Sequence, residues 1–396
     1  MIEAAARPRI RVAGSRAESH PLVLARRLDW ILLATAVALV AYGLWVVAGI
    51  TQFDVLGEPD YYLVRQAIAA GIGLVVLIAA TLVPIDLARR HWRALYGVTL
   101  ALMVLVFLVA ETIRGSKRWI DLGFIQFQPS ELGKVLFVLA LAGFLVERAG
   151  RVTRRRTILY AIGLGVAPIL LVFLQPDLGT ALVYSAALFS LLFFAGVRWR
   201  QLLTLIAAAA FVILSVLWFL PAAGVEVLKP YQADRLTGLV DRDRDPSGLT
   251  WNVNQSITAV GAGGLTGRGP TEASQTRQDF LPEHATDFAF ASLAEQRGFV
   301  GSSILLLLYL LVIWRGLRVI TVAGDLYGAV VAGGLIFALV FQVFVNVGMT
   351  MGVAPVTGIP LPFVTVGGSS MVANLLMIGV LQGIHARGAP AARSFP

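Results

Sequence analysis

Four ionisable side chains stand directly before a long apolar run in the segment DFLPEHATDFAF: Asp279, Glu283, His284 and Asp287. Pro282 suits the first turn of a helix, where its missing N–H costs nothing. A helix that runs on from Pro282 would place Glu283 and Asp287 four apart on one face. An aspartate beside a second carboxylate at a membrane boundary can accept a proton. The alternative is that these acids only complement the helix dipole.

A second cluster lies in IRGSKRWIDLGFIQFQPSELGK, where Lys117 and Arg118 precede Trp119. Glu131 is expected in the first turn of the following helix, and Lys134 three positions later can pair with it. A lysine at membrane depth costs about 2.5–3.5 kcal/mol unless it is paired or reaches the surface. Lys134 is therefore a candidate anion-binding group. The alternative is a lysine that only extends to the membrane surface.

A third stretch, GMTMGVAPVTGIPLPFVTVGGSSM, is punctuated by glycine and proline at membrane depth. Irregular backbone is tolerated there only where it is buried in protein or lines a cavity. The segment from Gly367 to Ser370 can present backbone N–H groups to an anion, so Ser369 is a candidate substrate contact. The alternative is a plain loop between two spans. Gln255, in a long loop upstream, is a further candidate substrate contact.

A membrane bundle has to position these residues, because 58% of the 396 residues are hydrophobic and only 14% are charged. Soluble domains carry roughly 25% charged residues, and about 18 consecutive apolar residues suffice for a spanning helix. The expected fold class is an all-α polytopic membrane protein with about ten transmembrane helices. The expected spans are about 28–50, 62–84, 94–111, 131–147, 157–175, 179–197, 201–220, 286–314, 326–349 and 364–385.

Arginine and lysine crowd alternate loops, which by the positive-inside rule places both termini in the cytoplasm. The segments that carry chemistry then lie on the extracytoplasmic side, with a large loop, residues 221–285, between spans seven and eight. We expect a disordered basic cytoplasmic tail at 1–27, one membrane domain at 28–385 and a cytoplasmic C-terminal tail at 386–396.

Several classes of chemistry are excluded by composition. The chain has no cysteine, which excludes disulfides and thiolate catalysis. Its net charge of +9 comes from basic residues scattered among loops, so nucleic acid is not an expected partner. The sequence contains no phosphate-binding loop ending in Lys-Ser or Lys-Thr and no Cys/His zinc spacing. We expect no organic cofactor.

Together these stretches resemble the SEDS family (shape, elongation, division and sporulation proteins) from about residue 28 to 385. The motifs are, in order, RWIDLGFIQFQPSELGK, QPDLGT, YQADR, GLTGRG, DFLPEHATDFAF, NVGMTMGVAPVTGIPLPF and GGSS. The resemblance implies a SEDS-type bundle in the bacterial cytoplasmic membrane that polymerises lipid II into glycan strands. It also implies a class B penicillin-binding protein transpeptidase as partner, with other membrane proteins of the elongation complex. DFLPE and GIPLPF resemble the RodA elongation branch more than the FtsW division branch.

The resemblance implies a catalytic role for Asp287, the aspartate that follows Leu-Pro-Glu. The expected substrate contacts are Arg118, Trp119, Glu131, Lys134 and, from neighbouring positions, Lys117 and Glu283.

The sequence departs from the family's pattern at three places. The family's histidine stands directly before the Thr-Asp pair, whereas here Ala285 takes that place and His284 stands one position earlier. Gln296-Arg297 and Thr365-Val366 are the other two departures.

In glycan polymerisation a sugar 4-hydroxyl attacks an anomeric carbon, and a carboxylate such as Asp287 can take the hydroxyl proton. The leaving diphosphate needs cations, for which we expect Arg118, Lys134 or a divalent metal (Mg²⁺ or Mn²⁺), with Asp287 as a candidate metal ligand. Three alternatives stay open: a lipid II flippase or other transporter, an FtsW-like division counterpart, and a scaffold that only binds the transpeptidase.

Overall fold

The computed structural model describes residues 21–110, 118–121, 123, 126–222, 224 and 249–388 of the chain. Its long helices are α2 (Trp30–Ile50), α3 (Tyr61–Leu82), α5 (Trp92–Val109), α6 (Pro129–Glu147), α7 (Arg155–Leu174), α8 (Leu178–Phe194), α9 (Trp199–Leu214), α15 (Ala289–Val322), α16 (Leu326–Thr350) and α17 (Gly368–Gly388). The shorter elements are α1 (Pro21–Arg26), α4 (Ile85–Arg90), β1 (Ile120–Asp121), β2 (Gln126–Phe127), η1 (Ala149–Arg151), η2 (Ser215–Phe219), α10 (Leu220–Ala222), α12 (Leu249–Ala262), α13 (Gly269–Glu272) and α14 (Ser274–Arg277).

Within these ranges, nine helices are long and apolar enough to cross a membrane, if α9, η2 and α10 are taken as one span. Helix α8, an apolar helix of 17 residues, is a shorter tenth. Each of the ten expected runs corresponds to one of these helices, so the predicted fold class is confirmed. Runs of this length form helices because every backbone polar group is then satisfied within the segment.

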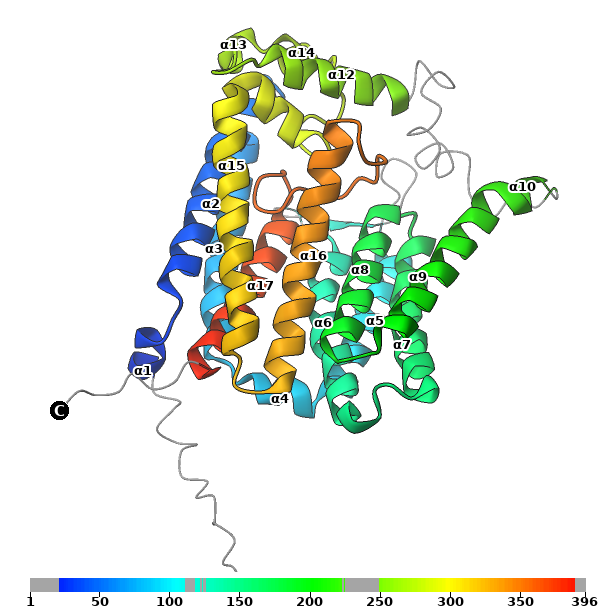
Figure 1. Ribbon diagram of the computed structural model, residues 1–396. Helices are drawn as coiled ribbons and strands as arrows, with labels where there is room; N and C mark the ends of the chain where they lie inside the picture. Colours follow the sequence, from blue (N-terminus) through cyan, green and yellow to red (C-terminus); the bar gives the residue numbers. More distant parts are fainter. Residues whose placement is uncertain are drawn as a thin grey trace, which may run out of the picture.

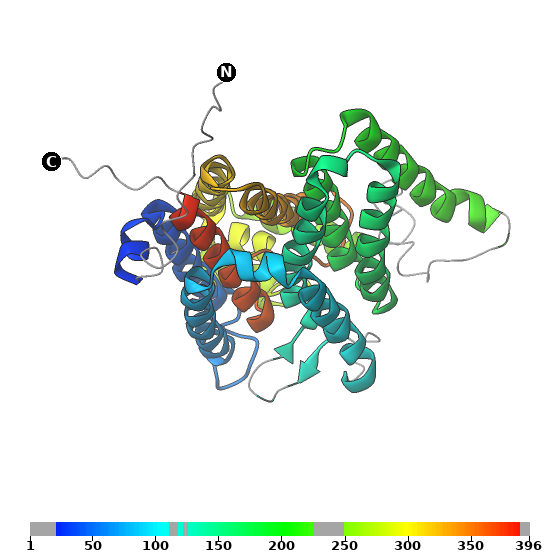
Figure 2. The same cartoon turned by 90° about the horizontal axis from the view of Figure 1, so that it is seen from below.

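Helices α6 and α17 lie at the centre of the bundle, since 83% of the apolar part of each is buried by other helices. Helix α17 lies along α3, α2 along α15, and α16 along α8. Figure 1 shows these helices side by side, with α12, α13 and α14 across the end that we call the upper end. The span Trp199–Ala222 is only 6% buried, and Figure 2 shows it leaning away from the bundle. Its apolar side chains therefore suit contact with lipid rather than with protein.

Helix α15 is broken at Gly298, whose φ of 65° and ψ of −163° only glycine adopts readily. The GLTGRG motif fills the break: the N–H of Phe299 donates to the carbonyl of Gly264 at 2.9 Å, and the N–H of Arg268 donates to the carbonyl of Glu295 at 3.0 Å. The upper part of α15 bends over toward α16 as a result (Figure 1). The break carries the segment before α15 over the centre of the bundle.

The segment 351–367, between α16 and α17, is irregular. Ile359, Leu361, Phe363 and Val364 within it are buried, so this backbone lies inside protein rather than in a plain surface loop. Phe363 adopts a φ of 68°, and Tyr309 on α15 donates its hydroxyl hydrogen to the carbonyl of Pro362. The expectation that this irregular backbone is buried in protein is confirmed here.

The predicted tails and the long loop contain more helix than the sequence indicated. Residues 1–20 and 389–396 lie outside the described residues, but Pro21–Arg26 form helix α1, which corrects the expected disorder there. Residues 386–388 belong to α17. The described parts of the loop 221–285 carry α12, α13 and α14.

Candidate functional site

Asp287 lies in a turn, not in a helix. Residues 282–288 form successive turns and α15 begins at Ala289, which corrects the expectation that a helix starts at Pro282. The reason is Glu283, whose φ of 54° is left-handed and whose carbonyl accepts the N–H groups of both Thr286 and Phe288 at 3.1 Å. Glu283 and Asp287 therefore do not share a helix face. Both side chains are half-buried.

The buried irregular segment holds this turn in place. The carbonyl of Ala285 accepts the N–H of Val366 at 3.0 Å, and the carbonyl of Thr286 accepts the hydroxyl of Thr365 at 3.2 Å. Glu283 is folded back on the turn, where its carboxylate accepts the Thr286 hydroxyl at 2.8 Å. The departure at Thr365-Val366 thus lies directly against the turn that carries Asp287.

Asn346 on α16 fixes the backbone of Asp287 itself. Its side-chain amide donates to the carbonyl of Asp287 at 3.1 Å and to the carbonyl of Ile359 at 2.8 Å. Asn346 has no solvent exposure. Its Oδ1 atom has no hydrogen-bond partner among the described residues.

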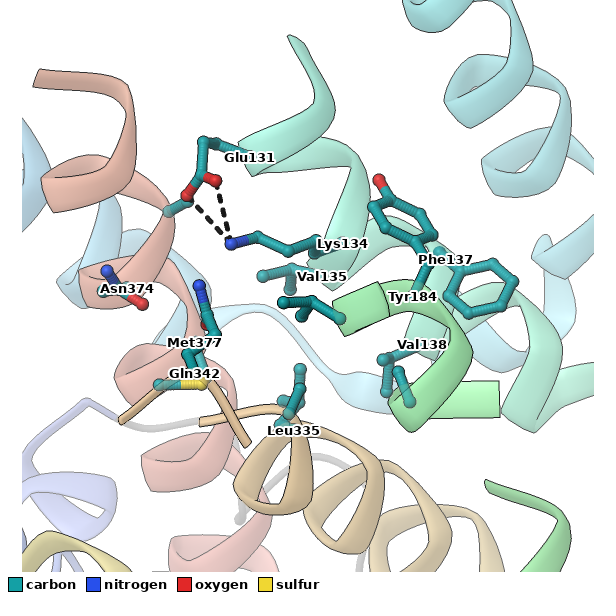
Figure 3. A pocket seen from close by; sticks show the side chains of 14 residues that line it. Glu131, Lys134, Val135, Phe137, Val138, Tyr184, Leu335, Gln342, Asn374 and Met377 are labelled. Carbon is teal, nitrogen blue, oxygen red and sulfur yellow. Dashed lines mark hydrogen bonds and ion pairs between the residues drawn. The ribbon is translucent and has the colours of Figure 1, made fainter. Parts of the chain in front are cut away.

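A cavity lies between α6, α8, α16 and α17, next to the Glu131–Lys134 pair (Figure 3). The ammonium of Lys134 donates to both carboxylate oxygens of Glu131 at 2.9 Å. Lys134 is 9% exposed and Glu131 1% exposed, so the predicted local pair is confirmed and Lys134 does not extend to the surface. Two of the three N–H groups of Lys134 are engaged by Glu131. Gln342 and Asn374 are the other polar lining residues besides Tyr184.

Helix α16 connects the cavity to the Asp287 turn. Gln342 lines the cavity, and Asn346, which holds Asp287, is one helical turn further along the same face. The Nε2 atom of Gln342, like Oδ1 of Asn346, is buried without a partner among the described residues. Most buried polar atoms in proteins are hydrogen-bonded. These two atoms, on adjacent turns of α16, are therefore available to hydrogen-bond a polar ligand.

Arg118 is held beside the same helices. One terminal nitrogen donates to the carbonyl of Pro176, and the other lies 3.8 Å from a carboxylate oxygen of Asp177. Asp177 caps α8, and its side chain accepts the Thr180 N–H at 3.1 Å. The Nε atom of Arg118 is buried without a partner among the described residues, which leaves a donor for an anion. The guanidinium lies 5.7 Å from the ring centroid of half-buried Trp119.

The remaining predicted contacts have other neighbours. Ser369 joins α17 to β2, because its hydroxyl accepts the N–H of Gln128 at 2.8 Å and donates to the carbonyl of Gln126 at 2.9 Å. Gln255 is half-buried on α12 and is not a lining residue of the cavity. Lys117 lies outside the described residues.

The glycine-serine segment is less open to an anion than the sequence suggested. The N–H of Gly367 donates to the side chain of Gln66 at 3.1 Å, and the Gln66 amide donates to the carbonyl of Thr365 at 3.1 Å. Gln66 thus attaches the irregular segment to α3. The Gly367 N–H is engaged by protein, which removes it from the expected anion contacts.

Sequence reasoning missed Glu295, Gln342, Asn346 and Gln66. Gln342 and Asn346 stand four apart in an otherwise apolar run, a pattern that marks one polar helix face. Glu295 has no solvent exposure, and its carboxylate accepts the N–H groups of Gln275 and Thr276 at 2.8 and 2.9 Å. It pins α14 to the upper part of α15. No local pattern pairs Glu295 with residues about twenty positions upstream.

The expected divalent cation has no complete protein cage within the described parts of the chain, where no group of three or more His, Cys, Asp or Glu residues could hold a metal. Mg²⁺ is commonly bound through one or two carboxylates together with substrate phosphates. A cation at Asp287 would depend on such shared binding.

Comparison with known proteins places the chain in a family. Residues 27–389 match the model of the FtsW/RodA/SpoVE family of cell cycle proteins, and the chain belongs to this family. It is a multi-pass membrane protein of the SEDS type. The chain is 35% identical over 358 residues to the peptidoglycan glycosyltransferase MrdB of Escherichia coli K12, covering 90% of this chain and 94% of that protein.

Two further relatives bear on the activity. The probable peptidoglycan glycosyltransferase FtsW of Thioalkalivibrio sulfidiphilus is 36% identical, with 91% of this chain and 90% of that protein covered. A chain from a structure described as structural coordination of polymerization and crosslinking by a peptidoglycan synthase complex superposes with a TM-score of 0.76 at 33% identity. That match covers 91% of this chain and 98% of the other. Since MrdB and FtsW match at nearly equal identity, similarity does not separate elongation from division.

Proposed function

We propose that this protein is a peptidoglycan glycosyltransferase that polymerises lipid II into glycan strands at the outer face of the bacterial cytoplasmic membrane. One observation carries the proposal: α16 holds the turn of Asp287 through Asn346 and, one helical turn away, lines the Glu131–Lys134 cavity through Gln342. Asp287, in this turn, provides a proton acceptor, and the buried ammonium of Lys134 on α6 provides an anion-binding cation. The names of the relatives support the same reaction.

In the proposed reaction, the 4-hydroxyl oxygen of one sugar forms a bond to the anomeric carbon of another. The bond from that carbon to the diphosphate oxygen breaks, and its electron pair leaves with the lipid diphosphate. Asp287 takes the hydroxyl proton as the new bond forms, through an oxocarbenium-like transition state. Lys134 and Arg118 have N–H groups left for the diphosphate after their contacts with Glu131 and Asp177.

A divalent cation bound by the diphosphate would supply further positive charge for the leaving group. Independently of such a cation, Asp287 takes the hydroxyl proton, and Lys134 and Arg118 bind phosphate oxygens.

We assign the protein to cell elongation and shape maintenance rather than division, on the strength of the DFLPE and GIPLPF motifs. A class B penicillin-binding protein is the proposed partner, since the matched synthase complex couples polymerization to crosslinking. Depletion in a rod-shaped host tests this assignment: an elongation enzyme gives rounded cells, whereas filamentous cells would assign the chain to division.

The activity is tested by placing purified protein in liposomes with fluorescent lipid II. A glycosyltransferase produces a polymer that does not extract with the lipid II monomer and that lysozyme digests. Transfer of lipid II between leaflets without polymer would instead make the protein a transporter. The feature that favours this alternative is the buried irregular segment 351–367, because transporters build their binding sites from interrupted helices. If neither polymer nor transfer is detected while the partner transpeptidase still binds, the protein is a scaffold.

A further inference from the structure

We propose that His284 is a positioning residue: its imidazolium ties the turn that carries Asp287 to the loop between α2 and α3 through Asp54. This inference rests on the proposed function, because it concerns how the same carboxylate is held for catalysis.

Both ring nitrogens of His284 face acceptors. Nε2 lies 3.0 Å from a carboxylate oxygen of Asp54, and Nδ1 lies 3.7 Å from a carboxylate oxygen of Asp279. A neutral imidazole has one N–H, whereas the cationic ring has two. Only the cation can donate toward both carboxylates. The ring is largely shielded from water, with His284 8% exposed.

The charged neighbours favour that cation. Burial alone would lower the pKa of His284, but the hydrogen bond and charge of Asp54, the charge of Asp279 and a hydrogen bond to the Leu281 backbone outweigh it and raise the pKa. Because the pKa of His284 is raised, the contact between the charged ring and Asp54 is fully formed below the ordinary histidine pKa. It is lost as the pH rises through the raised pKa. Among the described residues, Asp54 and Asp279 are the charges acting on the ring.

The loop that carries Asp54 is anchored to the end of α2. The N–H of Asp54 donates to the carbonyl of Thr51, which caps α2. The Gln296 amide on α15 donates to the carbonyl of Gly49 at 3.0 Å, and the guanidinium of Arg297 lies 3.9 Å from the ring centroid of Trp45. The upper end of α2 is thus bound to α15 just before the loop begins.

A second contact fixes the loop on its other side. Arg277 of α14 lies 4.9 Å from the ring centroid of Phe53, the residue before Asp54. A cation over an aromatic face is attracted to it. The loop therefore offers His284 a carboxylate whose position is set by α2, α14 and α15 together.

The turn transmits the position of His284 to Asp287. The carbonyl of His284 accepts the hydroxyl of Ser292 at 3.1 Å, and the Glu283 carbonyl closes the turn onto Thr286 and Phe288. Only Ala285 and Thr286 lie between His284 and Asp287 in this closed turn. A displacement of about 1 Å at a catalytic group can lower the rate about 10²-fold, so a loosened His284 contact is sufficient to impair polymerisation.

The test is the pH dependence of kcat and KM for lipid II polymerisation. Asp54→Asn removes the negative charge and keeps the side-chain shape, so the alkaline limb of the kcat profile should move to lower pH while KM changes little. Asp60→Asn is the matched control, because Asp60 is an exposed carboxylate on the same loop whose side chain does not cap α3. It should leave the profile unchanged.

His284→Gln keeps a hydrogen-bond donor but cannot carry the charge. We expect kcat to fall by about 10-fold to 10²-fold and the alkaline limb attributed to the ring to disappear. An Asp54→Asn protein with the wild-type alkaline limb would overturn the proposal, as would a His284→Gln protein that keeps that limb.

Failure of the proposed function is distinguishable from failure of this inference. If wild-type protein forms no polymer, the enzyme assignment fails, and the tie between His284 and Asp54 is then measured by NMR titration of the His284 ring, identified by its loss in His284→Gln. A ring that titrates at lower pH in Asp54→Asn supports the tie. An unchanged titration overturns it.

Discussion

Replacement of Lys134 by methionine should destabilise the protein as well as abolish polymerisation. The substitution keeps an unbranched side chain of similar length but leaves Glu131 charged, with a side chain only 1% exposed and no longer bonded to an ammonium. The charged carboxylate would then lie in the low dielectric at the centre of the bundle.

The expected loss is large. Removing one partner of a buried ion pair costs about 3–5 kcal/mol. The lower part of that range applies, because the Lys134 side chain is 11% exposed and water can partly reach the site it leaves. The double variant Glu131→Gln/Lys134→Met removes both charges and should recover most of this loss. A coupling free energy of about 3 kcal/mol between the two sites follows.

The assay is a double-mutant cycle of the free energy of unfolding in mixed micelles, followed by circular dichroism, with lipid II polymerisation measured on the same samples. The double variant should fold stably and make no polymer, which separates loss of anion binding from loss of fold. A Lys134→Met protein as stable as wild type would refute the buried-pair reasoning. Full polymerisation by the double variant would refute the role of Lys134 in catalysis.

Three further predictions concern the contact between α14 and α15, the membrane topology and the divalent cation. Glu295→Gln leaves one oxygen for three donors, so it should cost about 1–3 kcal/mol and raise amide hydrogen exchange at Gln275 and Thr276; unchanged exchange would contradict the pinning of α14. A reporter fused after residue 270 should read as extracytoplasmic and one after Pro396 as cytoplasmic; cytoplasmic signal from residue 270 would overturn the placement of the site. Removal of divalent cations should lower the polymerisation rate and Mg²⁺ should restore it; a rate independent of chelator would exclude a cation shared between Asp287 and the diphosphate.

Hydropathy and local spacing predict a large part of this structure. Ten apolar runs correspond to ten helices, because span length is set by membrane thickness and helical rise. The Glu131–Lys134 pair follows from a three-residue spacing on one helix. The buried irregular segment follows from its glycines and prolines at membrane depth.

Long-range hydrogen bonds decide the features that the sequence does not predict. A helix from Pro282 is a sound local expectation, but Asn346 and Thr365 bond the backbone of the 285–287 turn, and Glu283 takes a left-handed conformation instead. The break at Gly298 depends on carbonyls of the GLTGRG motif about thirty-five residues upstream. Such partners are distant in sequence, so local patterns carry no signal of them.

The most direct test of the central claim is the rate of lipid II polymerisation by purified Asp287→Asn protein. Asparagine is nearly isosteric and leaves the backbone contact with Asn346 in place, but it cannot take a proton at working pH. Loss of a general base typically lowers the rate about 10²–10⁴-fold, while lipid II affinity should change far less. Glu58→Gln, at an exposed carboxylate, is the matched control and should polymerise at the wild-type rate. A defect of this size that persists at saturating Mg²⁺ is the result we predict; an Asp287→Asn rate within about threefold of wild type, well short of that loss, would contradict the assignment of Asp287 as the catalytic base.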